Sequence, residues 1–162
     1  ALAAGPEAIA EAIQVGGLAN VKAPRIHAIL SQLEREQGRL SLDLLAPMPV
    51  QAARDYLLAL PGVGPKTVAC VLLFSLHKPA MPVDTHVHRV AQRVGLVAPN
   101  VSAEKAHALL EEQLPEALYY PFHLNVIRHG REVCAARRPR CQACALAEIC
   151  DDLRARQSLA AG

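Results

Sequence analysis

Leu60-Pro-Gly-Val-Gly-Pro-Lys66 is the stretch that decides the fold of this 162-residue chain. An apolar pattern of helical spacing precedes it over about 52–60, and an apolar segment follows it over about 65–76. Pro65 suits the first position of the second helix, because its missing N–H has no partner there in any case. The stretch therefore predicts two helices joined by a tight glycine turn, with the second helix largely buried.

The turn itself has two interpretations. Gly62 and Gly64, on either side of Val63, supply backbone conformations that other residues resist and let a partner approach closely. The helix that follows presents free N–H groups, which suit a DNA phosphate. The three turn residues are therefore candidates for DNA contact, but an ordinary helical hairpin with a glycine turn explains them equally well.

The other segments are also helical in pattern. Apolar spacing and helix-capping residues predict helices over about 6–14, 24–38, 84–94, 102–114 and 117–129. No alternation of polar and apolar residues runs long enough to indicate a sheet, so the predicted fold class is all-α. Pro79 and Pro82 interrupt the helical pattern, and they place a domain boundary between residues 80 and 81.

Composition excludes several classes of protein. With 52% hydrophobic and 20% charged residues, the chain is not intrinsically disordered. Its longest apolar run, 68–76, is far shorter than the roughly 18 residues that a membrane span needs, and no signal peptide is visible. The net charge is only +2, but basic residues are concentrated near Arg137, Arg138 and Arg140.

Four of the five cysteines lie close together with the spacing Cys-x6-Cys-x2-Cys-x5-Cys, at Cys134, Cys141, Cys144 and Cys150. An odd total without a secretory signal argues against a disulfide framework. Four thiolates at this spacing suit either zinc or an iron–sulfur cluster, and the residues alone do not decide between them.

Three blocks in the same order resemble the endonuclease III family of DNA repair glycosylases: the glycine turn at 60–67, Val83-Asp-Thr-His-Val-His-Arg89, and the cysteine cluster. The resemblance implies a helix-hairpin-helix glycosylase fold, with a helical barrel domain over 1–80, an iron–sulfur domain over 81–162, and the active site in the cleft between them. It also implies a [4Fe–4S] cluster on the four cysteines, with a structural role. The basic insert at 135–140 would then be a rigid loop that meets phosphates through its three arginines.

Lys66 and Asp84 are the candidate catalytic residues. A lysine in the first turn of an apolar helix is disfavoured in its charged form by desolvation and by the helix dipole, which is one way to activate an amine. Asp84 is explained equally by capping the helix that follows it. The resemblance implies that Lys66 is the Schiff-base nucleophile and that Asp84 supports charge and proton transfer, while His86 faces DNA. A zinc site on Asp84, His86 and His88 is disfavoured, since only the first and last share a helix face.

Leu18 is the remaining candidate. The segment Gly17-Leu18-Ala19-Asn20 resembles the family loop whose leucine enters the duplex when the damaged base leaves the stack. Without the resemblance, Leu18 would be taken as a core residue. Nothing in residues 1–16 corresponds to the family's N-terminal portion, and we therefore expect that portion to be missing.

The sequence thus predicts a bifunctional DNA glycosylase and apurinic/apyrimidinic (AP) lyase of base excision repair. The resemblance implies oxidised pyrimidines of the thymine-glycol type as substrates and strand cleavage 3′ to the abasic site by β-elimination. The expected partner is double-stranded DNA with damaged bases or abasic sites, and we expect a monomer in the bacterial cytoplasm, at the nucleoid. A non-catalytic DNA-binding module and a monofunctional glycosylase for another base are the alternatives.

Overall fold

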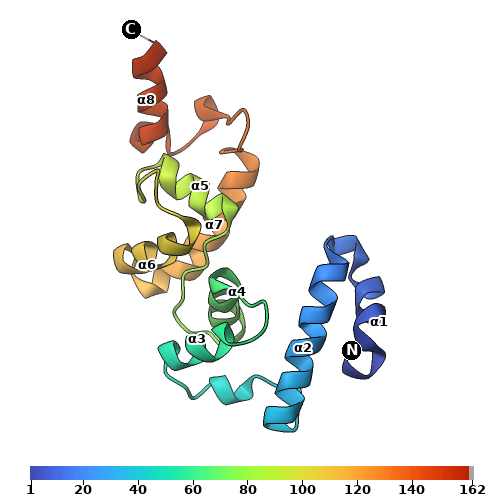
Figure 1. The fold of residues 1–162 in the computed structure, drawn as a ribbon. Helices are drawn as coiled ribbons and strands as arrows, with labels where there is room; N and C mark the ends of the chain where they lie inside the picture. The colour runs from blue at the N-terminus through green and yellow to red at the C-terminus, as the bar shows by residue number, and fades with distance from the viewer. Residues whose placement is uncertain (161–162) are drawn as a thin grey trace. The chain divides into compact units, whose positions relative to one another are not determined.

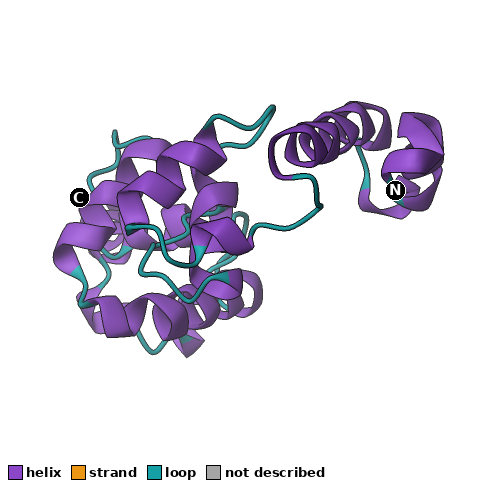
Figure 2. Cartoon of the chain, turned by 90° about the horizontal axis from the view of Figure 1, so that it is seen from below, coloured by secondary structure: helices purple, strands orange, loops and turns teal. Residues whose placement is uncertain are grey.

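The computed structural model describes residues 1–160, and within them every regular element is a helix (Figure 2). No strand occurs in this part of the chain, which confirms the all-α prediction. None of the helices in the described part is both long enough and apolar enough to cross a membrane. The chain divides into two compact units, Ala1–Gly64 and Pro65–Gly162. The predicted domain boundary between residues 80 and 81 lies inside the second unit and stays a prediction.

The first unit is built on two helices that pack against each other, α1 (Gly5–Ala12) and α2 (Ala19–Gln37), followed by α3 (Val50–Leu58) (Figure 1). We expected the second helix to start at Pro24, and this was wrong. The carbonyl of Leu18 accepts hydrogen bonds from two N–H groups at the start of α2, so the first turn forms ahead of the proline. Pro24 then lies inside the helix, where it removes one backbone hydrogen bond.

The second unit begins with α4 (Pro65–Cys70), which continues into a π-helical segment, Val71–Ser75. Next come α5 (Thr85–Arg93), α6 (Ala103–Gln113), α7 (Tyr119–Glu132) and α8 (Asp151–Ala160). Helices α5 and α7 lie side by side (Figure 1). Aliphatic side chains and one tyrosine form the core of this unit: Leu73, Met81, Val83, Val87, Ala91, Val97, Ala106, Leu110 and Tyr119.

Candidate functional site

The glycine turn depends on only one of its two glycines for its shape. Gly62 has a φ of +74°, and a Cβ there would collide with the side chain of Arg25. Gly64 has no such φ, and a Cβ built on it would meet nothing within 4 Å. The prediction that the turn needs a special conformation is therefore confirmed for Gly62 and wrong for Gly64. The bare backbone at Gly64 leaves open space beside the turn.

Lys66 lies in the first turn of α4, and its side chain is exposed. The desolvation that we expected there is absent, because the apolar face of α4 points away from it through Val68 and Ala69, which are fully buried. Of the two effects expected to disfavour the charged form of Lys66, only the helix dipole at the N-terminus of α4 remains.

Asp84 caps α5 as predicted. Its Oδ1 atom accepts hydrogen bonds from the backbone N–H groups of His86 and Val87, each 2.8 Å long. The side chain is half-buried, so the cap holds the carboxylate in one place without removing it from solvent.

His123 on α7 is a site residue that the sequence analysis missed. Its side chain is only 4% exposed, and its Nδ1–H donates to the carbonyl oxygen of Pro82 at 2.9 Å. The pKa of His123 is lowered from its ordinary value of 6.5, chiefly because burial disfavours the charged ring. The Lys66 ammonium lowers the pKa further, whereas the Pro82 carbonyl and the Asp84 carboxylate raise it. Both candidate catalytic residues therefore act on one buried imidazole. Helical spacing from Tyr119, four residues earlier, was the available signal for its burial.

The other two histidines of this region are held by local contacts. His86 is half-buried, and its Nδ1 lies 3.1 Å from the guanidinium of Arg89. The Nε2 atom of His88 lies 2.8 Å from the carbonyl oxygen of Val101. In residues 1–160, no three His, Cys, Asp or Glu side chains gather closely enough to hold a metal ion.

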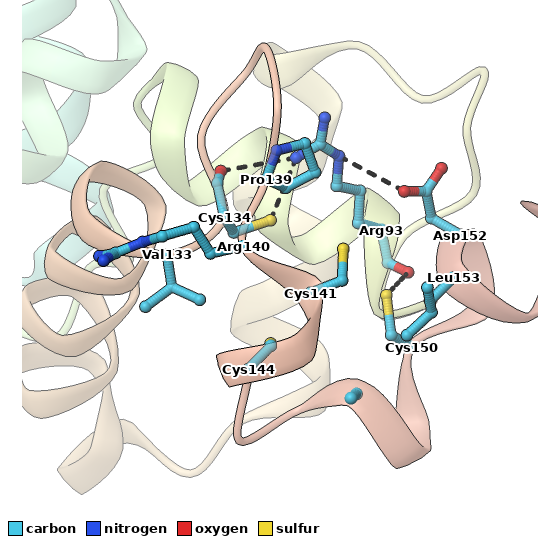
Figure 3. Close-up of a pocket in the computed structure, with 11 residues that line it drawn as sticks. Arg93, Val133, Cys134, Pro139, Arg140, Cys141, Cys144, Cys150, Asp152 and Leu153 are labelled. Atoms are coloured by element: carbon cyan, nitrogen blue, oxygen red, sulfur yellow. Dashed lines mark hydrogen bonds and ion pairs between the residues drawn. The ribbon is translucent and has the colours of Figure 1, made fainter.

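The four cysteines line one small cavity of about 20 Å³ in the second unit (Figure 3). All four are free thiols and half-buried. Arg93, at the end of α5, donates from its guanidinium to Sγ of Cys134 at 3.2 Å and to the carbonyl oxygen of Ala135 at 2.9 Å. Its Nε lies 3.7 Å from a carboxylate oxygen of Asp152. The cysteine loop is thus fastened to the same helix that Asp84 caps.

The chemistry of this donor set suits either one zinc ion or an iron–sulfur cluster. Four sulfurs on one zinc would lie about 3.8 Å from each other, given zinc–sulfur bonds of about 2.3 Å in a tetrahedron. In the structure the four cysteines line one common cavity. Four cysteines around one cavity also suit an iron–sulfur cluster, in which each thiolate binds a different iron.

The arginine loop and Leu18 are both exposed. Arg137, Arg138 and Arg140 of the arginine loop (residues 135–140) are exposed, although the Arg140 guanidinium donates to the carbonyl oxygen of Glu132. Arg138 has a φ of +55°. In the first unit, Leu18 is 73% exposed and has a φ of +57°. This left-handed conformation is strained for a branched side chain, and strain of this kind is concentrated at functional sites. Leu18 is therefore not the core residue that its sequence alone suggests.

Comparison with known proteins matches residues 1–116 to the model of the HhH-GPD superfamily of base excision DNA repair proteins. This chain belongs to that superfamily. The HhH-GPD chain is 37% identical over 151 residues to endonuclease III of Thermotoga maritima, covering 93% of this chain and 66% of that protein. It is 32% identical over 165 residues to the DNA glycosylase/AP lyase ROS1 of Arabidopsis thaliana, covering 91% of this chain and 12% of ROS1.

Among solved structures, the HhH-GPD chain is similar to a trapped covalent intermediate of endonuclease III with DNA. The TM-score is 0.81 at 30% identity, with 96% of this chain and 69% of that chain covered. The fold is therefore that of endonuclease III, although this chain spans only part of each of these proteins.

Proposed function

We propose that this chain acts as a bifunctional DNA glycosylase and AP lyase on oxidised pyrimidines in double-stranded DNA. The observation that carries the proposal is the carboxylate of Asp84, which two backbone N–H groups hold at the start of α5, in the same unit as the exposed amine of Lys66. Both charges also act on the pKa of the buried His123. The relatives support it: ROS1 is named as a glycosylase and AP lyase, and endonuclease III has been trapped covalently on DNA. The choice of oxidised pyrimidines rests on the resemblance to the endonuclease III family.

In this reaction, the Nζ atom of Lys66 forms a bond to C1′ of the damaged nucleotide as the bond from C1′ to the base breaks. The base leaves with the electron pair and takes up a proton, while the amine loses one. Opening of the sugar ring then gives a Schiff base between Nζ and C1′. Loss of a proton from C2′ breaks the C3′–O bond and cleaves the strand. Asp84 would support the positive charge on the sugar and accept the proton of the amine.

Three features would hold the DNA. The open backbone at Gly64 would let a phosphate approach the turn, and the arginine loop would neutralise further phosphates. Leu18 would fill the space left by the extruded base, because it is already exposed in a strained loop.

Cys134, Cys141, Cys144 and Cys150 would hold a [4Fe–4S] cluster. When bound, the cluster would supply structural ligation that joins the ends of the arginine loop, with no part in base excision. The loop between the first two cysteines would then be rigid, and its arginines would meet phosphates with little loss of entropy.

Borohydride trapping tests the proposal. The protein is incubated with duplexes that carry thymine glycol, an abasic site, or no damage, beside the variants Lys66→Ala and Lys105→Ala. Lys105 is an exposed lysine of the same unit and serves as the control. We expect a covalent adduct on the first two duplexes with the wild type and Lys105→Ala, and none with Lys66→Ala, because only an amine on C1′ is reduced to a stable bond.

Other outcomes point to the alternatives. Salt-sensitive DNA binding without product would indicate a non-catalytic binding module. Release of base without trapping would indicate a monofunctional glycosylase. An adduct that survives Lys66→Ala would show that another amine is the nucleophile. The monomeric state and the nucleoid location stay predictions.

A further inference from the structure

The segment that leads to Asp84 has no regular structure, and its last four residues before Asp84 are buried. Residues 77–84 form neither helix nor strand, and Ala80 and Met81 are fully buried, while Val83 is 2% exposed. Buried backbone N–H and C=O groups need partners, which a helix or a sheet normally provides. The N–H of Lys78 donates to the carbonyl oxygen of Leu72, and the partners of Met81 and Pro82, further along the segment, are side chains.

Two buried histidines and one glutamate provide them. His107 on α6 lies with Nδ1 2.8 Å from the carbonyl oxygen of Met81, and His123 on α7 makes the same contact with Pro82. The Glu111 carboxylate accepts the N–H of Met81 at 2.9 Å. Because a carbonyl only accepts, each imidazole carries its hydrogen on Nδ1. The position of Asp84 is thus fixed from α6 and α7 by side-chain contacts.

His123 differs from His107 in the residues and charges that surround it. It holds the residue closer to Asp84, its ring centroid lies 5.5 Å from that of Phe74, and the Lys66 and Asp84 charges both act on it. A charged imidazole here would repel the Lys66 ammonium and compete with it for the Asp84 carboxylate. An uncharged imidazole leaves that carboxylate to the amine.

We propose that His123 is a positioning residue for the reaction of Lys66. Its uncharged ring holds the Pro82 carbonyl, and with it Asp84, at the place where the carboxylate serves the amine. The inference rests on the proposed function, since it takes Lys66 as the nucleophile and Asp84 as its support. It adds a residue that touches neither DNA nor the reacting atoms.

Four variants test it: His123→Leu, His123→Asn, His107→Leu and His107→Asn. The asparagine amide can donate where Nδ1 donates, whereas leucine fills space without a donor. The measurement is the single-turnover rate of borohydride trapping on a preformed abasic-site duplex, followed against pH and corrected for the folded fraction. Circular dichroism gives that fraction.

We expect His123→Leu to slow trapping by roughly 10- to 100-fold, the scale of effect of a misplaced catalytic group, and to displace the pH profile. His123→Asn should recover most of the rate. The His107 variants should lower thermal stability but keep the wild-type pH profile, because they leave the charges beside Lys66 unchanged. If His123→Leu does not fold, the pH profile of trapping by His123→Asn is compared with that by His107→Asn. A profile that is displaced only in His123→Asn supports the inference.

Two results would overturn the inference. One is a His123→Leu variant that folds and traps with the rate and pH profile of the wild type. The other is the same change of profile in the His107 and His123 variants, which would reduce both histidines to structural anchors. A wild-type protein that traps nothing is a different result, since it removes the proposed function itself.

Discussion

Arg93 donates a hydrogen bond to Sγ of Cys134 across 3.2 Å, and it does so from the last residue of the helix that Asp84 caps. The same guanidinium also reaches the carbonyl oxygens of Ala135 and Ala136. A cation beside a thiolate stabilises its negative charge, and the extra bonds hold the start of the arginine loop.

We therefore expect Arg93→Met to shorten the life of the proposed cluster. Methionine keeps most of the aliphatic stem but donates nothing, so the loop should loosen and the cysteines lose their metal more readily. Iron and acid-labile sulfide are measured over time in the presence of a chelator. Arg156→Met is the matched control, because Arg156 pairs with the same Asp152 but does not contact the loop. Equal loss of iron and sulfide from both variants would contradict the prediction. Zinc without acid-labile sulfide in the purified protein would show that the cysteines hold a zinc ion and not a cluster.

Substitution of the two turn glycines should have different effects, one on stability and the other on DNA binding. Gly62→Ala introduces a side chain at a positive φ and against Arg25, so it should destabilise the chain by about 1 kcal/mol or more. Gly64→Ala meets no neighbour and should melt like the wild type. It should bind a damaged duplex about tenfold more weakly, because the added methyl group would keep a phosphate away from the turn. This is the scale of one lost hydrogen bond to a charged group. Thermal melts and fluorescence anisotropy measure the two effects. Full affinity in a folded Gly64→Ala variant would exclude the turn from the interface.

Substitution of Leu18 should affect the stability of the chain and the rate of base excision in different ways. Leu18→Gly relieves the left-handed strain and should melt higher than Leu18→Ala, by about 1 kcal/mol in stability. Both variants should excise thymine glycol more slowly than the wild type, because neither fills the space of the extruded base. Leu159→Ala, a change at another exposed leucine, should excise normally. Unchanged excision in both Leu18 variants would assign the loop no part in the reaction.

His123 should make the folded state sensitive to acid. Its pKa is lower when folded than when unfolded, so the unfolded chain binds more protons below pH 6.5. Its contribution to stability is therefore complete above that pH and falls as the pH drops through the folded-state pKa. His123→Asn should flatten the loss of stability between about pH 7 and about pH 5, as measured by urea unfolding.

The titration of His123 can also be followed directly by nitrogen NMR of the imidazole. Lys66→Ala should raise its pKa because a repelling charge is lost, and Asp84→Asn should lower it because an attracting charge is lost. A midpoint that moves with neither variant would show that the two charges do not reach the ring.

The sequence predicts most of this fold because its helices carry their own signals. Asp84 caps the helix that it was expected to cap, the helix predicted from residue 102 is capped by the Ser102 side chain, and the helix after the turn begins at Pro65. Pro24 misled the analysis, since the preceding turn closes on the Leu18 carbonyl, which no spacing of apolar residues records. His123 was missed for a related reason. Its partner Pro82 is 41 residues away, and contacts at that distance leave no periodic pattern.

One junction in the chain has a mechanical consequence. Gly64 ends the turn, Pro65 begins α4, and Lys66 follows at once. The proline ring restricts the φ of the one residue that separates these two positions along the chain. The proposed phosphate contact and the proposed nucleophile are therefore two residues apart in sequence. A single residue inserted between them should cost more activity than affinity, because each position would keep its own local structure while their spacing changes.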